Sequence, residues 1–274
     1  MTREEAKPGF NQRLRATIDS RRSHVCVGLD LDLRRLPDSV TKDRRGAEAF
    51  LRTLIEATAD HVAAFKPNLA FYLSLGKWGF DLLSRLREWI PPEIILIGDA
   101  KWGDIGNTAE RYSTSAFEVL GFDAVTVNPY QGSDAVMPFL RNESRGAFVL
   151  CRSSNPSAGE FQELGLEVPL YASVAKAAAN WNVSDNCGLV IGADAVEALA
   201  YARRHSPDLP LLIPGVGAQR GDLTRCLTEM AGTEPATFLV NASRSILYAS
   251  RAERYWESAA GEAKKLRDTI DAGL

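Results

Sequence analysis

The feature that most constrains the fold of this chain is an alternation, repeated eight times, between a short apolar run and a longer stretch with helical periodicity. The apolar runs lie at residues 24–29, 61–65, 94–98, 124–127, 147–151, 188–191, 209–213 and 237–240. Most of these runs are continuously apolar, which is typical of parallel strands covered on both faces. Eight strand–helix units within 274 residues predict a single (β/α)8 TIM barrel, a fold of about 250 residues.

The stretches between these runs predict the outer helices, because their apolar residues recur at helical spacing. They lie at residues 46–60, 80–89, 107–120, 133–141, 170–180, 195–205, 220–230 and 254–270. We expect residues 1–22 to form an N-terminal helical extension, residues 23 to about 250 the barrel, and residues 254–272 a C-terminal helix. Since no Gly- and Ser-rich linker interrupts the chain, residues 1–274 are predicted to form one domain. An open, doubly wound sheet is the alternative fold.

Composition limits the chemistry that such a barrel would carry out. The formal net charge of −3 argues against a nucleic-acid surface, and no apolar stretch is long enough to predict a membrane span. The chain has only three His and four Cys, and their spacing favours neither a metal site nor a His-paired nucleophile. The cysteines in apolar runs and the charged N-terminus indicate a cytoplasmic protein. We therefore expect chemistry based on carboxylates, ammonium groups and the backbone, with no metal or cofactor.

Charged side chains are concentrated where the second and third predicted strands end. Asp99 and Lys101 are two residues apart, so both would point to the same side of an extended chain. Lys66 follows the neighbouring strand, and the catalytic residues of such barrels come from these strand ends. Asp104 follows a glycine and is expected either to curl back over the site or to reach a neighbouring subunit. Alternating charges keep one another ionised, and a purely structural ion-pair network is the alternative interpretation.

A second group of residues follows the seventh and eighth strands. Gly215 and Gly217 precede a predicted helix that starts near Gln219, and Arg244 follows the last strand. Glycines let backbone N–H groups approach an anion, and a helix N-terminus favours negative charge. The loops after strands 7 and 8 frequently bind phosphate in such barrels, and Arg244 can add a bidentate contact. We interpret this group as a phosphate site.

Taken in order along the chain, these residues resemble the longer bacterial branch of the orotidine 5′-phosphate decarboxylase family. The resemblance extends from about residue 24 to about residue 250. Its motifs are Gly28-Leu29-Asp30, Phe65-Lys66-Pro67, Asp99-Ala100-Lys101-x-x-Asp104-Ile105 and Ser154-Asn155-Pro156. The resemblance implies a barrel that converts orotidine 5′-phosphate to UMP without a cofactor, as part of pyrimidine biosynthesis.

The resemblance also implies roles for the charged residues. Lys66, Asp99, Lys101 and Asp104 match the catalytic tetrad of the family. Lys101 holds the position of the proton donor to C6, and Asp99 that of the carboxylate placed against the carboxylate of the substrate. Asp104, together with Ile105 and Thr108, matches residues that the family contributes to the neighbouring site across a homodimer interface.

The remaining matches imply contacts with the rest of the substrate. Asp30 matches the residue that binds a ribose hydroxyl, and Ser154 the serine that reads the pyrimidine, with Ser153 leaving an uncertainty of one residue. Gln219 and Arg244 match the phosphate ligands. One departure is Ala242-Ser243 before Arg244, where many relatives have glycine, so a backbone N–H contact is not implied there.

Two other functions are compatible with parts of this pattern. A sugar-phosphate decarboxylase or aldolase of the same superfamily would share the Asp-x-Lys-x-x-Asp motif, but it would require Mg²⁺ among clustered carboxylates. Asp30 and Asp99 could belong to such a cluster, whereas Lys66 between them argues against a cation. A non-catalytic phosphate-binding barrel would require only the phosphate group of residues.

Overall fold

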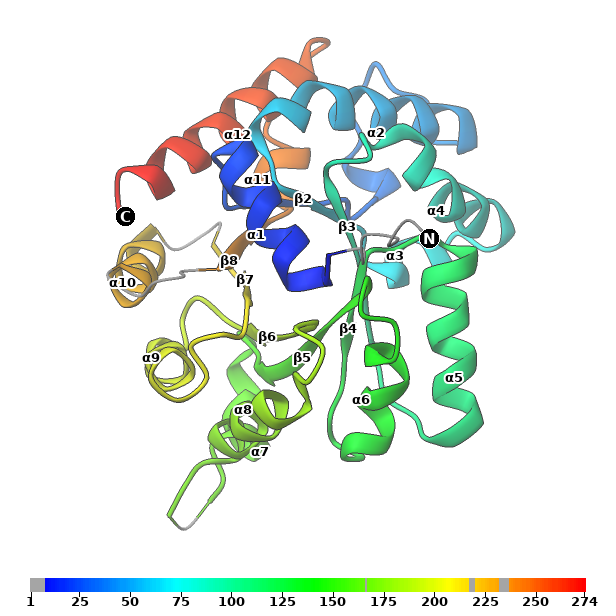
Figure 1. The fold of residues 1–274 in the computed structure, drawn as a ribbon. Helices are drawn as coiled ribbons and strands as arrows, with labels where there is room; N and C mark the ends of the chain where they lie inside the picture. Colours follow the sequence, from blue (N-terminus) through cyan, green and yellow to red (C-terminus); the bar gives the residue numbers. More distant parts are fainter. Residues whose placement is uncertain (1–7, 166, 217–219, 232–236) are drawn as a thin grey trace, which may run out of the picture.

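A computed structural model describes residues 8–165, 167–216, 220–231 and 237–274 of the chain. Within these ranges, eight parallel strands form a closed barrel in which each strand pairs with the next and β8 pairs with β1 (Figure 1). The strands are β1 (Val25–Gly28), β2 (Ala64–Lys66), β3 (Ile95–Trp102), β4 (Ala124–Val127), β5 (Gly146–Arg152), β6 (Cys187–Ile191), β7 (Leu211–Pro214) and β8 (Phe238–Ala242). The predicted barrel is confirmed, and the open sheet is excluded.

The expected helices surround the barrel, and their amphipathic faces are buried against it. They are α2 (Arg44–Thr58), α4 (Lys77–Trp89), α5 (Gly106–Thr114), α6 (Ser133–Leu140), α8 (Leu170–Trp181), α9 (Val196–His205), α10 (Arg220–Met230) and α12 (Tyr255–Asp271). The short helices α3 (Leu69–Leu73), α7 (Gly159–Gln162) and α11 (Arg244–Leu247) were not expected. No helix in the described ranges combines the length and the apolar character that a membrane span requires.

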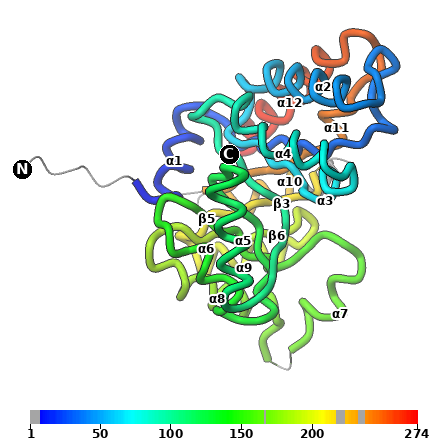
Figure 2. The backbone as a smooth tube through the Cα atoms, turned by 90° about the vertical axis from the view of Figure 1, so that its right-hand side faces the viewer, coloured from blue at the N-terminus to red at the C-terminus, as the bar shows by residue number. Residues whose placement is uncertain are grey.

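Helix α1 (Phe10–Arg21) covers one end of the barrel. Its buried side chains Phe10, Leu14 and Ile18 join the cluster formed by the inward-facing side chains of the strands. A Cβ atom on Gly146 would lie 2.2 Å from the ring of Phe10, so this close approach requires glycine. Figure 2 shows α1 at the end of the molecule opposite α3 and α7. The end at which the strands terminate is therefore left open for a site.

Two of the differences between the predicted and the observed strand limits affect the site. A 3-10 turn, η2 (Ala59–His61), occupies the start of the run predicted at 61–65, so β2 is shifted toward Lys66. Strand β3 continues to Trp102, four residues beyond the predicted end at residue 98, and so includes both Asp99 and Lys101. The register between β3 and β4 shifts between Gly98 and Trp102, and this bulge bends the strand end.

Candidate active site

Three of the predicted charged residues meet at the open end of the barrel. Inward-facing residues Ala64 and Ile97 belong to the interior cluster, and Lys66 and Asp99 lie two positions further along the same strands, so they point into the barrel as well. The Lys66 Nζ atom lies 2.6 Å from Asp99 Oδ2, and the Lys101 Nζ atom lies 2.6 Å from Asp99 Oδ1. One carboxylate therefore bridges two ammonium groups, and we call these three residues the charged array.

The members of the array differ in exposure. The side chains of Lys66 and Asp99 are 5% and 9% exposed, whereas that of Lys101 is 41% exposed. Burial opposes the ionisation of Asp99, but Lys66 and Lys101 outweigh it and hold the pKa of this carboxyl below its usual range. Burial likewise disfavours the charged form of Lys66, yet Asp99 and Asp30 outweigh it and raise its pKa. Asp99 and Lys66 thus stay ionised at neutral pH, and Lys101 is the exposed member of the array.

A threonine that the sequence analysis did not identify completes the surroundings of Asp99. Thr126 on β4 is 1% exposed, and its hydroxyl donates a hydrogen bond of 2.9 Å to Asp99 Oδ1. The Thr126 hydroxyl oxygen in turn accepts hydrogen bonds from the backbone N–H groups of Ala100 and Lys101, at 3.1 and 2.9 Å. In the sequence, Thr126 is an ordinary β-branched strand residue. Its contact with Asp99 becomes visible only when β3 and β4 are paired in the structure.

Asp30, just past β1, presents a free acceptor near the array. Its Oδ1 atom is buried and has no hydrogen-bond partner in the described structure. A buried polar atom without a partner is costly in a folded protein, so this oxygen suits a donor brought by a ligand. The Tyr248 hydroxyl fixes the segment by donating to the Asp30 carbonyl at 2.9 Å. Gly28 at the end of β1 lies so close to Ser243 that a Cβ atom there would approach the serine Oγ to 1.9 Å.

Asp104, Ile105 and Thr108 form no hydrogen bond or ion pair with the array among the described residues of this single chain. Asp104 is partly exposed, and its Oδ1 accepts only the N–H of Ile105, at 2.8 Å, among the interactions of the described residues. Ile105 is 48% exposed, and Thr108 on the first turn of α5 is exposed as well. The contacts of the described residues therefore do not tie Asp104 to Asp99, and both expected positions of Asp104 stay predictions.

The residues of the predicted phosphate site are described only in part. Gly215 follows β7 with a φ of +102°, a conformation that residues other than glycine rarely adopt. Arg244 begins α11, with one residue between it and the end of β8; it is exposed and forms no ion pair with the described residues. Gly217 and Gln219 lie outside the described residues. The described part thus offers an unpaired guanidinium close to the end of β8.

The two neighbouring serines after β5 differ in their contacts. The backbone N–H of Ser153 donates to Gln162 Oε1 at 2.8 Å, and its hydroxyl donates to Asn155 at 2.6 Å. Ser154, in contrast, is exposed and has no hydrogen-bond partner in the described ranges. Cβ atoms built on Gly192 and Gly215 would lie 2.8 and 3.5 Å from the Ser154 Cβ, so the serine lies over the ends of β6 and β7. Ser154 is therefore the serine that is free to contact a ligand at the open end.

Thiol and metal chemistry find no support in the described residues. The four cysteines are buried and unpaired, and burial raises the pKa of each to about 12. Cys26 lies below the array and donates a weak hydrogen bond of 3.5 Å to Asn241. No group of three His, Cys, Asp or Glu residues suited to a metal ion occurs in the part of the chain that the structure describes. The Lys66 ammonium binds Asp99 and is stabilised by the charge of Asp30 as well, so it already supplies a positive charge to both carboxylates.

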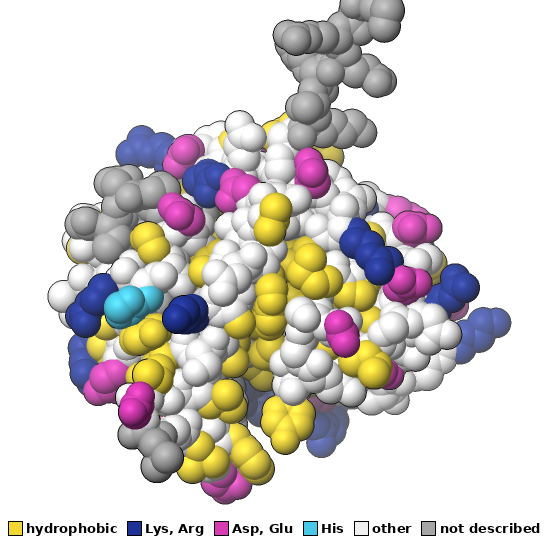
Figure 3. All heavy atoms as spheres, turned by 60° about the horizontal axis from the view of Figure 1, so that its bottom comes forward, with side chains coloured by type: hydrophobic (Ala, Val, Ile, Leu, Met, Phe, Trp, Pro, Cys, Tyr) yellow, Lys and Arg dark blue, Asp and Glu magenta, His cyan; other side chains and the backbone are white. Residues whose placement is uncertain are grey.

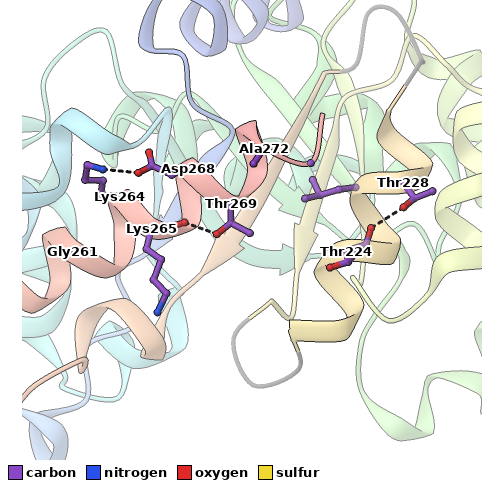
Figure 4. Close-up of a pocket in the computed structure, with 10 residues that line it drawn as sticks. Thr224, Thr228, Gly261, Lys264, Lys265, Asp268, Thr269 and Ala272 are labelled. Atoms are coloured by element: carbon purple, nitrogen blue, oxygen red, sulfur yellow. Dashed lines mark hydrogen bonds and ion pairs between the residues drawn. The ribbon is translucent and has the colours of Figure 1, made fainter.

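Two surface features lie outside the barrel mouth. A groove of about 600 Å³ separates α10 from α12, and Figure 4 shows that Lys264 in its wall is already paired with Asp268. The lower side of Figure 1, turned forward in Figure 3, carries apolar side chains in a hollow flanked by charged residues of both signs. Neither feature contains an array comparable to that of Lys66, Asp99 and Lys101.

Comparisons with known proteins identify relatives along nearly the whole chain. The model of the orotidine 5′-phosphate decarboxylase / HUMPS family matches residues 23–259. The chain is 49% identical over 266 residues to the orotidine 5′-phosphate decarboxylase of Thermomicrobium roseum, covering 96% of this chain and 95% of the relative. It is 45% identical over 269 residues to that of Roseiflexus sp. (strain RS-1), covering 97% and 98%.

A solved structure agrees with these sequence matches. The OMP decarboxylase of Leishmania donovani superimposes with a TM-score of 0.83 and is 36% identical, with 97% of this chain and 98% of that chain covered. The likeness thus includes the complete barrel and both strand ends that supply the array.

Proposed function

The chain belongs to the orotidine 5′-phosphate decarboxylase / HUMPS family and decarboxylates orotidine 5′-phosphate to UMP, and we propose that its charged array carries out this reaction without a metal ion. The observation that supports this assignment is the Asp99 carboxylate held between the ammonium groups of Lys66 and Lys101 at 2.6 Å each. This reaction is the last step in the formation of UMP.

The proposed chemistry requires no electron sink other than fixed charge. The bond between C6 and the carboxylate breaks, CO₂ leaves, and the electron pair remains at C6. The Lys101 ammonium stabilises this developing negative charge and then transfers a proton to C6, so that UMP forms and Lys101 becomes neutral until solvent reprotonates it. Its accessible side chain fits this role, whereas the buried Lys66 holds Asp99 in place.

Asp99 is proposed to lie against the carboxylate of the substrate. Because Lys66 and Lys101 keep it ionised, the two negative groups repel each other, and the repulsion is relieved when CO₂ leaves. Such destabilisation of the bound substrate is one way in which binding energy from a remote group can be used at the reacting centre. The phosphate of the substrate is that remote group.

The remaining predicted residues are proposed to bind the substrate. The unpaired Asp30 oxygen would accept a ribose hydroxyl, and the free Ser154 hydroxyl would contact the pyrimidine. Arg244 would bind the phosphate together with Gly215, and Gly217 and Gln219 are assigned to the same group by the sequence. Contacts with the pyrimidine at one end of the substrate and with the phosphate at the other would place C6 next to Lys101.

We also propose that the chain acts as a homodimer in the cytoplasm and that residues 1–274 form one domain. Ile105, Thr108 and Tyr112 present an exposed face of α5 and its N-cap, and a second copy of the chain could use this face to bring Asp104 to the neighbouring site. Four buried, unpaired cysteines fit a reducing compartment.

The direct test of the activity follows the loss of orotidylate absorbance with the purified protein in EDTA. We expect turnover under these conditions and no increase when Mg²⁺ is added. Turnover only with added Mg²⁺ would contradict metal-independence and favour the chemistry of the sugar-phosphate branch. Binding of orotidine 5′-phosphate without turnover would instead favour a non-catalytic phosphate-binding barrel.

A further inference from the structure

Thr126 uses its whole hydrogen-bonding capacity on the segment that carries Asp99 and Lys101. A hydroxyl has one proton to donate and two lone pairs that accept. The Thr126 proton is directed to Asp99 Oδ1 at 2.9 Å, and its oxygen accepts the N–H groups of Ala100 and Lys101 at 3.1 and 2.9 Å. All three contacts are made by a side chain that is 1% exposed, so solvent competes with none of them.

These contacts coincide with the bulge of β3. The pairing of β3 with β4 is regular at Gly98 and resumes at Trp102. Of the three N–H groups between them, the threonine hydroxyl accepts those of Ala100 and Lys101, and that of Asp99 donates to the Pro67 carbonyl at 2.9 Å. In the same interval Lys101 has a φ of +49°. This left-handed conformation is uncommon for a residue with a side chain and persists only where its surroundings enforce it.

We propose that Thr126 is the positioning residue that holds Lys101 in this conformation and orients Asp99, so that the ammonium of Lys101 is fixed at the open end of the barrel. Its importance for turnover rests on the proposed function. Asp99 Oδ1 accepts from Lys101 Nζ at 2.6 Å as well as from the threonine. The threonine therefore binds both the backbone and the charged partner of Lys101, and its loss would release both.

Two variants separate the effect of the Thr126 hydroxyl group from the effect of the side-chain shape. Thr126→Val keeps the branched shape and removes the hydrogen bonds, whereas Thr126→Ser keeps the hydroxyl. Thr58→Val is the matched control, because Thr58 is also 1% exposed but its hydroxyl donates only to the Leu54 carbonyl of α2, at 2.7 Å. We expect kcat to fall by roughly 10- to 100-fold in Thr126→Val, the range for a lost hydrogen bond to a charged group. Thr126→Ser and Thr58→Val should stay within about threefold of the unmodified protein, since neither loses such a bond.

The affinity for UMP distinguishes positioning from general damage. The groups proposed to bind ribose and phosphate lie on other strands, so Thr126→Val should bind UMP within about threefold of the unmodified protein. Unchanged kcat in Thr126→Val would overturn the proposal, and so would a parallel loss of kcat and UMP affinity that Thr126→Ser does not restore. If Thr126→Val does not fold, Thr126→Cys, with its weak donor and acceptor, is subject to the same criteria.

A crystal structure of Thr126→Val tests the positioning without any substrate. We expect Lys101 to leave the left-handed region and its Nζ to move beyond ion-pair distance of Asp99 Oδ1. An unchanged Lys101 backbone and ion pair would overturn the proposal even if the protein is an active decarboxylase. Conversely, failure of the unmodified protein to turn over orotidine 5′-phosphate would reject the proposed function, while this structural result would still decide the role of Thr126.

Discussion

Asp99 and Lys101, two residues apart on β3, form an ion pair of 2.6 Å at the open end of the barrel. The pair lies at the bulge in β3, where Lys101 adopts a φ of +49°. Lys66 binds the second oxygen of the same carboxylate from β2. Two cations are thus held around one anion, and the more exposed of them faces the position proposed for the substrate.

Replacing Asp99 by Asn should destabilise the fold, because Lys66 would remain buried without its principal counter-charge. Removing one partner of a buried ion pair typically costs about 3–5 kcal/mol. We expect the free energy of unfolding, measured with urea at pH 7, to fall by about 3 kcal/mol. The matched control is Asp81→Asn, which breaks the exposed pair of Arg44 and Asp81 at 3.3 Å and should change stability by less than about 1 kcal/mol. Equal effects of the two variants would contradict this account of the array.

The direction of two pKa shifts sets the pH range in which both the stability of the array and kcat should stay constant. The folded-state pKa of Asp99 is below its ordinary value of 3.8, so its contribution to stability is present above that pH and is lost as the pH falls through the folded-state value. The pKa of Lys66 is above its ordinary value of 10.5, so its contribution is lost as the pH rises through the raised value. We expect kcat at saturating substrate to be constant between about pH 5 and pH 9, where neither group titrates. A titration of kcat near pH 7 would show that another group controls the reaction.

Arg244→Ala should weaken substrate binding mainly through the phosphate. Loss of a charge-assisted, bidentate contact raises KM, and we expect an increase of about 100-fold. Steady-state kinetics with orotidine, which lacks the phosphate, should show no further loss in this variant. Arg251→Ala, at an exposed arginine a few residues further along, serves as the control and should leave KM unchanged. An equal loss with both substrates would remove Arg244 from the phosphate site.

The position of Asp104 predicts a result for mixed subunits. If Asp104 acts across a dimer interface, Lys101→Ala and Asp104→Ala should each be nearly inactive as homodimers. A mixture of the two should regain activity, because a heterodimer contains one site with both residues intact. Turnover is measured after the subunits have exchanged, with the heterodimer detected by native mass spectrometry. Detection of the heterodimer without recovered activity would place Asp104 in the site of its own subunit.

Most of the fold and part of the site follow from local patterns in the sequence. Continuous apolar runs and helical periodicity predict the eight strands and their helices, because parallel strands of a barrel are buried on both faces. The spacing of Asp99 and Lys101 predicts their common side, since both lie on one strand. The glycines and Arg244 are identified by their place after β7 and β8, although Gly217 and Gln219 lie outside the described residues.

The remaining features depend on contacts between distant parts of the chain. Thr126 is an ordinary strand residue until β4 is paired with the bulge of β3, and the bulge itself has no signal in the sequence of residues 98–102. The choice between Ser153 and Ser154 depends on Gln162 at the end of α7, because its side-chain oxygen accepts a hydrogen bond from the backbone N–H of Ser153. The unexpected α3 and α7 form in the loops after β2 and β5, where no long periodic pattern exists to predict them.

The most direct test of the central claim measures turnover of orotidine 5′-phosphate by Lys101→Ala, together with its affinity for UMP. Loss of both the proton donor and the charge that stabilises C6 should lower kcat by at least about 10⁴-fold. The affinity for UMP should change by less than about tenfold, because the ribose and phosphate contacts remain. A kcat within tenfold of the unmodified protein would contradict the assignment of the array as the catalytic centre.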